Sequence, residues 1–224
     1  KNCLKLVIVK LEKHLNHKIN TLSEMFPSLE NKHYKSLLKG IIFRIIENNG
    51  FFSKYMIKND LKLLKDDDFI ILKKLGIVIG KEKVYIIDIF KPYKAKYRWM
   101  LAHIFKKYTI QKFPNKNILQ SKNSPKLAWN SIGYELIDGL AVNIKVIEKL
   151  SKYLSYKSFK NKKFRINTSS FTSQNISSIN FMTLTASLGY KKISGDSKIS
   201  YWTRKPFKKD KYKPNSDSPF SVLN

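Results

Sequence analysis

The chain has 224 residues, with 44 Lys and Arg against 16 Asp and Glu, which gives a formal net charge of +28. This length suffices for one large domain or two small ones, and such a chain buries roughly 70% of its unfolded surface. The apolar fraction of 42% excludes a wholly disordered chain, and no apolar run reaches the ~18 residues of a membrane span. The single cysteine, Cys3, excludes an intrachain disulfide and a multi-cysteine zinc site. A reducing, cytoplasmic location is therefore expected.

The charge predicts a polyanionic partner, RNA or DNA, and no membrane partner. Lys, Asn and Ile are abundant together and only four of the cations are Arg, a bias that an AT-rich genome imposes on any protein. That bias exchanges Arg for Lys but does not readily explain so few acids. The chain opens at Lys1 without a methionine or a signal-peptide pattern, which indicates a piece of a longer protein.

The first half of the sequence is dominated by helical periodicity. Apolar residues recur at helical spacing over residues 3–26 and again over about 32–48, where the second pattern stops at Asn48-Asn49-Gly50. A third pattern covers about 54–64, and a fourth begins at the acids Asp66 to Asp68, which we interpret as caps at the positive end of a helix. Residues 1–112 are therefore predicted to form a helical accessory domain.

Two short β-like segments over residues 76–87 and a long helix over about 93–107 complete this predicted domain. Residues 113–128 contain two prolines and no sustained periodicity, so they are predicted to be a linker.

The second half begins with two strand-like segments over 131–142, followed by a helix that Asn143 caps. A basic stretch, a second helix over about 176–188 and a hairpin around Ser194 to Ser197 follow. Helix, helix and hairpin in this order predict a small winged-helix-like module over 129–206, and residues 207–224 are predicted to be a flexible basic tail. The expected fold class is α+β, predominantly α-helical, with the helical domain first.

No motif for catalysis is found. Gly76 and Gly80 have three residues between them and Glu82 after the lysine, whereas a phosphate-binding loop needs four residues and a Ser or Thr. The four histidines are scattered, and Cys3 has no evident base beside it. No catalytic residue, metal site or cofactor is therefore expected in this segment.

Two basic stretches interleaved with aromatic residues are the best candidates for contact with nucleic acid. Cations neutralise phosphates, while aromatic faces stack on unpaired bases for about 1–3 kcal/mol each, so a single strand suits them better than a duplex. The candidate residues are Lys157, Lys160, Lys162, Lys163, Arg165, Trp202, Arg204, Lys205, Lys208 and Lys209. The alternative interpretation is that the aromatics anchor each loop to the core and the lysines are merely solvated. The aromatic and basic run over 93–108 is interpreted as a half-buried helix.

Short strings along the chain resemble the C-terminal part of alphaproteobacterial helicase-like proteins, which are superfamily 2, DExH-type relatives of the mitochondrial degradosome RNA helicase. The strings are LKGIIFRIIENNG (38–50), KLGIVIGKEKVYI (74–86), FKP (90–92), YRWMLA (97–102), GYELIDGLAV (133–142), LGY (188–190) and DSPFSVL (217–223). Their shared order carries the resemblance more than any one string.

The resemblance implies that an ATP-driven motor, with ATP and Mg²⁺ as its cofactors, lies N-terminal to Lys1 and that this chain guides the single strand. The motor motifs are absent from this segment, so no catalytic residue is transferred. The motor domains of the same chain would be its protein partner. Two alternatives remain open: a stand-alone basic RNA-binding or ribosome-associated structural protein, and a protein-interaction scaffold whose charge is genome bias alone.

Overall fold

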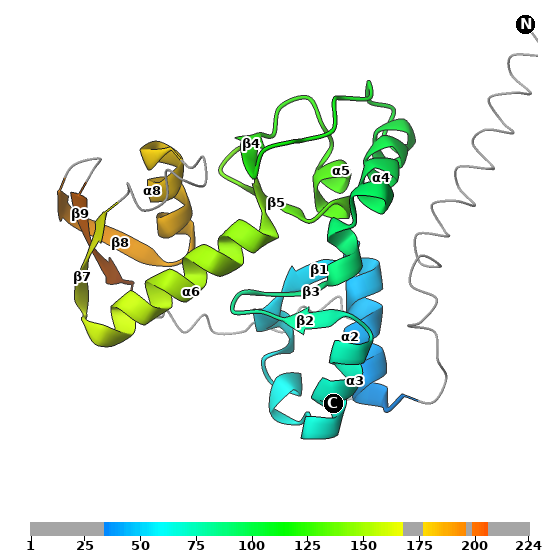
Figure 1. Ribbon diagram of the computed structural model, residues 1–224, viewed down its shortest axis with the longest axis horizontal. Coiled ribbons are helices and arrows are strands. Elements are labelled where there is room, and N and C mark those ends of the chain that lie inside the picture. The colour runs from blue at the N-terminus through cyan, green and yellow to red at the C-terminus, as the bar shows by residue number, and fades with distance from the viewer. Residues whose placement is uncertain (1–33, 168–176, 196–198, 206–224) are drawn as a thin grey trace, which may run out of the picture.

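The computed structural model describes residues 34–167, 177–195 and 199–205 (Figure 1). Within these ranges, helices alternate along the chain with three antiparallel sheets of three strands each. The predicted layout, a predominantly helical domain followed by a winged-helix-like module, is therefore wrong. The fold is mixed α+β, and its small sheets are distributed along the whole described chain. The predicted helix over 3–26 and the predicted tail over 207–224 lie outside the described residues.

The first sheet forms within the predicted helical domain. Its strands β2 and β3 lie in the β-like segments predicted over 76–87, whereas β1 was not predicted. Its strands pair in the order β1-β3-β2, and both pairings are antiparallel. The elements in this part are α2 (Ser36–Glu47), β1 (Phe51–Ser53), α3 (Asp66–Lys74), β2 (Ile77–Ile79), β3 (Lys83–Ile86) and α4 (Pro92–Phe105).

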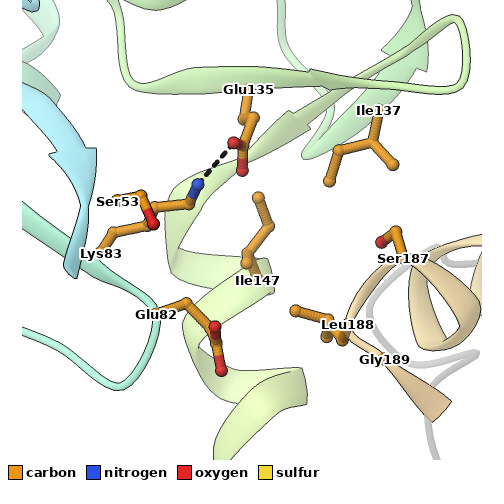
Figure 2. A pocket seen from close by; sticks show the side chains of 9 residues that line it. All are labelled: Ser53, Glu82, Lys83, Glu135, Ile137, Ile147, Ser187, Leu188 and Gly189. Carbon is orange, nitrogen blue, oxygen red and sulfur yellow. Dashed lines mark hydrogen bonds and ion pairs between the residues drawn. The ribbon is translucent and has the colours of Figure 1, made fainter. Parts of the chain in front are cut away.

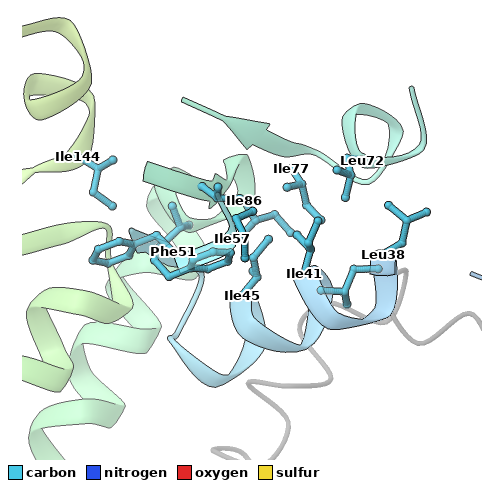
Figure 3. Close-up of a cluster of buried hydrophobic side chains, with 13 residues drawn as sticks. Leu38, Ile41, Ile45, Phe51, Ile57, Leu72, Ile77, Ile86 and Ile144 are labelled. Atoms are coloured by element: carbon cyan, nitrogen blue, oxygen red, sulfur yellow. The ribbon is translucent and has the colours of Figure 1, made fainter. Parts of the chain in front are cut away.

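Apolar side chains from α2, α3 and this sheet form the first core (Figure 3). Leu38, Ile41 and Ile45 recur on one face of α2 and are at most 1% exposed, as the 3.6-residue period predicted. Asn49 and Gly50 end α2 with φ values of 59° and 104°, so the predicted stop is confirmed. Ile144, the first residue of a helix more than fifty residues further along, packs into the same core.

The second sheet follows α4 in the chain and precedes the long helix that begins at Ile144. It consists of β4 (Ile118–Gln120), β6 (Leu140–Asn143) and β5 (Tyr134–Ile137) in that order, with α5 (Lys126–Ser131) before β5. Trp99 of α4 packs edge to face on Trp129 of α5, with 4.8 Å between ring centroids. Elements on both sides of residues 113–128 thus share one core, and the predicted linker itself contains β4.

The third sheet packs on α6 (Ile144–Lys160), the longest helix among the described residues. Asn143 caps α6 by accepting a hydrogen bond from the amide of Lys145 at 3.0 Å, as the sequence predicted. The sheet order is β7-β9-β8. The remaining elements are β7 (Lys163–Asn167), α8 (Ser178–Ser187), β8 (Tyr190–Gly195) and β9 (Ile199–Arg204). The predicted helix over 176–188 is confirmed as α8, and the two strands of the predicted hairpin pair antiparallel; residues 196–198 of its turn lie outside the described residues.

One predicted helix is wrong. Residues 54–64 form two short 3₁₀ turns, Lys54–Ile57 and Asp60–Lys62, rather than an α-helix. The acids that follow do begin a helix: Asp68 accepts a hydrogen bond from the amide of Lys65 at 3.0 Å and one from Lys35 Nζ at 3.1 Å. These two donors hold the pKa of Asp68 below its ordinary value. Along the described ranges, no helix has both the length and the apolar character needed to cross a membrane.

Candidate nucleic-acid interface

The outward side of α6 carries a line of basic residues of which the sequence analysis singled out only Lys160. Residues spaced by about four and seven positions share one face of a helix. On α6 the exposed residues at this spacing are Lys145, Lys149, Lys152, Tyr156 and Lys160, and we call them the outer stripe of α6. With a rise of about 1.5 Å per residue, the stripe extends over roughly 22 Å.

The outer stripe contains no acid because the one acidic residue of α6 is turned inward. Glu148 is 5% exposed, and its carboxylate accepts hydrogen bonds from the backbone amides of Lys81, Glu82 and Lys83 at 2.5, 2.9 and 2.7 Å. Three amides converging on one carboxylate form a compact anion site. Gly80 is required there, since a Cβ at this position would lie 2.4 Å from the Glu148 carboxyl carbon.

The β2–β3 turn, which was excluded above as a phosphate loop, thus binds an anion of its own chain. Its second link to α6 is the Ser151 hydroxyl, which donates to the Glu82 carboxylate at 2.5 Å. The turn therefore fixes α6 on the first sheet and leaves the opposite side of the helix to solvent.

The third sheet presents a second basic surface, which we call the outer face of the third sheet. Lys163, Thr203 and Lys191 stand side by side across its three strands, and the next exposed row places Arg165 beside Tyr201. Tyr201 is 44% exposed, so an aromatic ring lies next to a guanidinium on the central strand. This surface joins the C-terminal end of α6 through the short turn at Lys162.

Trp202 does not belong to this surface, and its assignment as a base-stacking residue is corrected. It is 2% exposed and packs in the core beneath the sheet, and its indole nitrogen donates to the Ser200 hydroxyl at 2.7 Å. Side chains alternate across a strand, so when Trp202 faces the core its neighbour Tyr201 must face out. Tyr201 is the aromatic residue that the sequence analysis missed.

The other predicted residues divide between the two surfaces and their edges. Lys160 lies on the outer stripe, while Lys163 and Arg165 lie on the outer face of the sheet. Arg204 and Lys205 are exposed at the end of β9, and Lys162 is exposed in the turn. Lys157 is half-buried, with its Nζ 5.6 Å from the centre of the Tyr153 ring. Lys208 and Lys209 lie outside the described residues.

Two exposed aromatic rings stand beside the lysines at the C-terminal end of α6. Phe159 is 92% exposed and Tyr156 is 57% exposed. The Nζ of Lys160 lies 4.6 Å from the centre of the Tyr156 ring, a cation–π contact. Rings at this exposure keep more than half of their surface in contact with water, so they are available to a ligand.

The carboxylates that form ion pairs lie away from these two surfaces. Within residues 34–167, 177–195 and 199–205, ion pairs hold Lys35, Lys83, Lys91 and Lys94, all of which precede α6. Asp196 is the one acidic residue between Lys149 and Lys205. No ion pair is found in the described structure for the lysines of the outer stripe or for Lys163, Arg165 and Lys191 on the sheet's outer face.

The basic and aromatic run on α4, by contrast, is partly structural. Arg98 is 3% exposed and donates to the carbonyl oxygens of Ser131 and Ile89, each at 2.7 Å. Burial lowers the pKa of Arg98 to about 10. The interpretation of residues 93–108 as a half-buried helix agrees with this packing.

Metal-binding side chains are not clustered in the part of the chain that the structure describes. There, no group of three or more His, Cys, Asp and Glu side chains is placed to hold a metal ion. The chain was also compared with protein-family models, curated proteins and solved structures, and none of them matches it.

Proposed function

We propose that this chain binds single-stranded nucleic acid along the outer stripe of α6 and over the outer face of the third sheet. In this role it is the strand-guiding C-terminal region of an ATP-dependent superfamily 2 helicase. The observation that supports binding most directly is the outer stripe itself: four lysines and a tyrosine on one helix face, with Glu148 withdrawn into the β2–β3 turn.

The physical basis is neutralisation of phosphates. Each lysine that meets a phosphate releases condensed counterions, which favours binding at low salt. Consecutive lysines of the stripe are separated by about 4.5–12 Å along the helix axis, so they can meet more than one phosphate of the same strand.

Exposed rings favour a single strand over a duplex. Phe159, Tyr156 and Tyr201 offer flat apolar faces beside cations, and unpaired bases stack on such faces without sequence preference. A duplex keeps its bases stacked on each other and would leave these rings in water. We therefore expect weak dependence on sequence and a preference for unpaired strands.

The helicase context, with ATP and Mg²⁺ bound by a motor N-terminal to Lys1, rests on the resemblance of the seven short strings. A cytoplasmic location belongs to the same proposal. The helicase context is tested by reading the coding sequence upstream of Lys1: a phosphate-loop motif followed by a DExH box supports the helicase. A start codon directly before Lys1 would favour the stand-alone RNA-binding protein.

The binding proposal is tested with a labelled oligouridylate of about twenty nucleotides, by fluorescence anisotropy between 50 and 200 mM salt. Lys149→Gln with Lys152→Gln removes two stripe charges without changing the fold. Each lost phosphate contact reduces the slope of log affinity against log salt by about 0.7 for a single strand, so we expect a decrease of about 1.4.

The matched control is Lys73→Gln with Lys74→Gln, which removes two exposed charges from α3. It has the same change in net charge at a site outside the proposed surface. If both double variants lose affinity equally, binding follows net charge alone and the assignment to α6 is wrong. If the unaltered chain does not bind at 50 mM salt, the proposed function itself is wrong.

A further inference from the structure

The side of α2 that faces away from the first core carries five exposed residues. We call it the outer face of α2, and its members are Ser36, Lys39, Gly40, Phe43 and Glu47. All of them lie within about 60° of Phe43 around the helix, because each residue turns the helix by about 100°. Leu38, Ile41 and Ile45 point from the opposite side of α2 into the first core (Figure 3). One side of α2 is therefore packed, and the other is exposed.

A large ring and a glycine lie next to each other on this face. Phe43 is 64% exposed. Gly40 precedes it by one turn, and a Cβ at Gly40 would meet nothing within 4 Å in the described chain. Its φ lies outside the left-handed region, and glycine destabilises the interior of a helix relative to alanine. The glycine leaves a groove beside the Phe43 ring, into which a second helix can pack closely.

The charges of this face are arranged so that the face is complementary to itself. Lys39, Phe43 and Glu47 are spaced by four residues and form one ridge along the helix. Lys83 and Glu135 pair within the chain (Figure 2), whereas no ion pair is found among the described residues for Lys39 or Glu47. The ridge has a cation at one end, a ring in the middle and an anion at the other end. It therefore matches a copy of itself that runs in the opposite direction.

We propose that two copies of this chain associate through the outer faces of their α2 helices, about a two-fold axis that passes beside Phe43. Two helices that pack by ridges of this kind cross at about 50°. In such an antiparallel pair, Lys39 of each copy lies within reach of Glu47 of the other, and Phe43 of each copy packs over Gly40 of the other. A two-fold interface uses the same surface on both copies, so a second copy supplies every group that this face requires.

The association is expected to be weak. One helix face is smaller than the roughly 1,200 Å² that a stable complex buries, so we expect a dissociation constant on the order of 100 μM. The net charge of +28 on each copy opposes association, and about 200 mM salt screens this repulsion beyond about 7 Å. At low micromolar concentration the chain is therefore monomeric. The outer face of α2 shares no residue with the proposed nucleic-acid surfaces, so this proposal does not depend on nucleic-acid binding.

The direct test is sedimentation equilibrium of the full chain without nucleic acid, from about 10 to 500 μM in 200 mM salt. The unaltered chain should show a reversible equilibrium between monomer and dimer. Lys39→Glu and Glu47→Lys each bring like charges together twice across the two-fold axis, so each variant alone should associate about tenfold more weakly. In an equimolar mixture of the two variants, the mixed dimer restores both ion pairs. The mixture should therefore associate within about threefold of the unaltered chain.

The matched control is Lys73→Glu, which changes the net charge as Lys39→Glu does, at an exposed position of α3. It should associate like the unaltered chain. Three results would each overturn the proposal: an unaltered chain that stays monomeric over the whole range, a mixture that associates no better than its two components, and an equal loss of association in Lys73→Glu.

A second measurement examines the ring and the groove. Phe43→Ala should reduce association below detection, whereas Tyr55→Ala, which removes a ring that is 65% exposed, should leave it unchanged. Gly40→Ala should raise the melting temperature of the dilute, monomeric chain by about 2 °C and weaken association severalfold, because its methyl group occupies the groove. Equal association of Phe43→Ala and Tyr55→Ala, or unweakened association of Gly40→Ala, would overturn the proposal.

Discussion

The part of the molecule before α6 and the part formed by α6 and the third sheet use their charges in different ways. In the first part, Lys35, Lys83, Lys91 and Lys94 each lie within ion-pair distance of a carboxylate, and Asp88 alone holds two of them. Although burial raises the pKa of Asp88, the hydrogen bonds from Lys91 and Lys94 lower it overall.

In the second part, no such ion pair is found among the described residues for the lysines of the outer stripe or for Lys163 and Arg165. Between Lys149 and Lys205 the sequence has one acid, Asp196, and the acid of α6 is buried against the β2–β3 turn. Net charge alone therefore says little about where a polyanion binds. The distribution of the few acids decides which lysines are available to it.

The largest expected effect concerns a charge buried in the first part. Arg98→Met removes the guanidinium that joins α4 to the carbonyl oxygens of Ser131 and Ile89, leaving both without this donor. We expect a loss of about 4 kcal/mol in the free energy of unfolding. This corresponds to a melting temperature roughly 8–16 °C lower.

Calorimetry measures this effect, with Arg44→Met on the half-buried side of α2 as the control. A change in Arg98→Met no greater than that of the control would mean that the buried charge of the first part is not structural, and the contrast between the two parts would disappear.

The next effect in size concerns Glu148, which joins α6 to the β2–β3 turn of the first part. Glu148→Ala leaves the amides of Lys81, Glu82 and Lys83 without their acceptor, at a cost of about 3 kcal/mol. Chemical denaturation measures it, and Glu47→Ala, which removes an exposed carboxylate from the end of α2, is the control. Equal midpoints for Glu148→Ala and the unaltered chain would show that the turn does not fix α6.

Exposed aromatic rings allow the two parts of the molecule to be compared in their contribution to nucleic-acid binding. Tyr201→Ala and Phe159→Ala should each weaken oligouridylate binding by about 1–2 kcal/mol, or roughly 5–30-fold, if a base stacks on each ring. Tyr93→Ala, which removes an 86% exposed ring from α4, should leave the affinity unchanged. Equal losses from all three variants would indicate that exposed rings bind wherever they lie.

The smallest effect depends on pH. The pKa of Asp68 is lowered in the folded chain from an ordinary value of 3.8. Its stabilising contribution is therefore complete above this value and is lost as the pH falls through the lowered pKa. Asp68→Asn should melt a few degrees lower than the unaltered chain at pH 7, and this difference should shrink below about pH 4. A difference that grows on acidification would contradict the capping role.

Local signals in the sequence predicted much of the secondary structure. The stop at Asn49 and Gly50, the cap at Asn143 and the helix start at Asp66 to Asp68 are each decided by a few neighbouring residues, and each was predicted correctly. The three-residue strand β4 was missed because its only support is distant pairing with β6. The layout was wrong because Ile144 and Glu148 attach α6 to the first sheet, an association that periodicity does not encode.

The candidate surface was found only in part. Lys163 and Arg165 were predicted from their neighbours in the sequence. Helical spacing also places Lys145, Lys149 and Lys152 on one face of α6. The sequence does not show that Glu148 is buried, and without this fact that side of the helix does not stand out as free of acids. The alternation of Tyr201 and Trp202 indicates that one ring is buried, and the register of β9 determines which one.

We claim that the lysines of α6 contact the single strand and that the exposed lysines of the first part do not. Acetylation footprinting of the full chain with and without oligouridylate, read by mass spectrometry, compares them in one experiment. Lys149, Lys152 and Lys163 should be protected severalfold by the oligonucleotide, while Lys73 and Lys74 should react at the same rate in both samples. Equal protection of both groups, or protection of Lys73 and Lys74 alone, would contradict the claim.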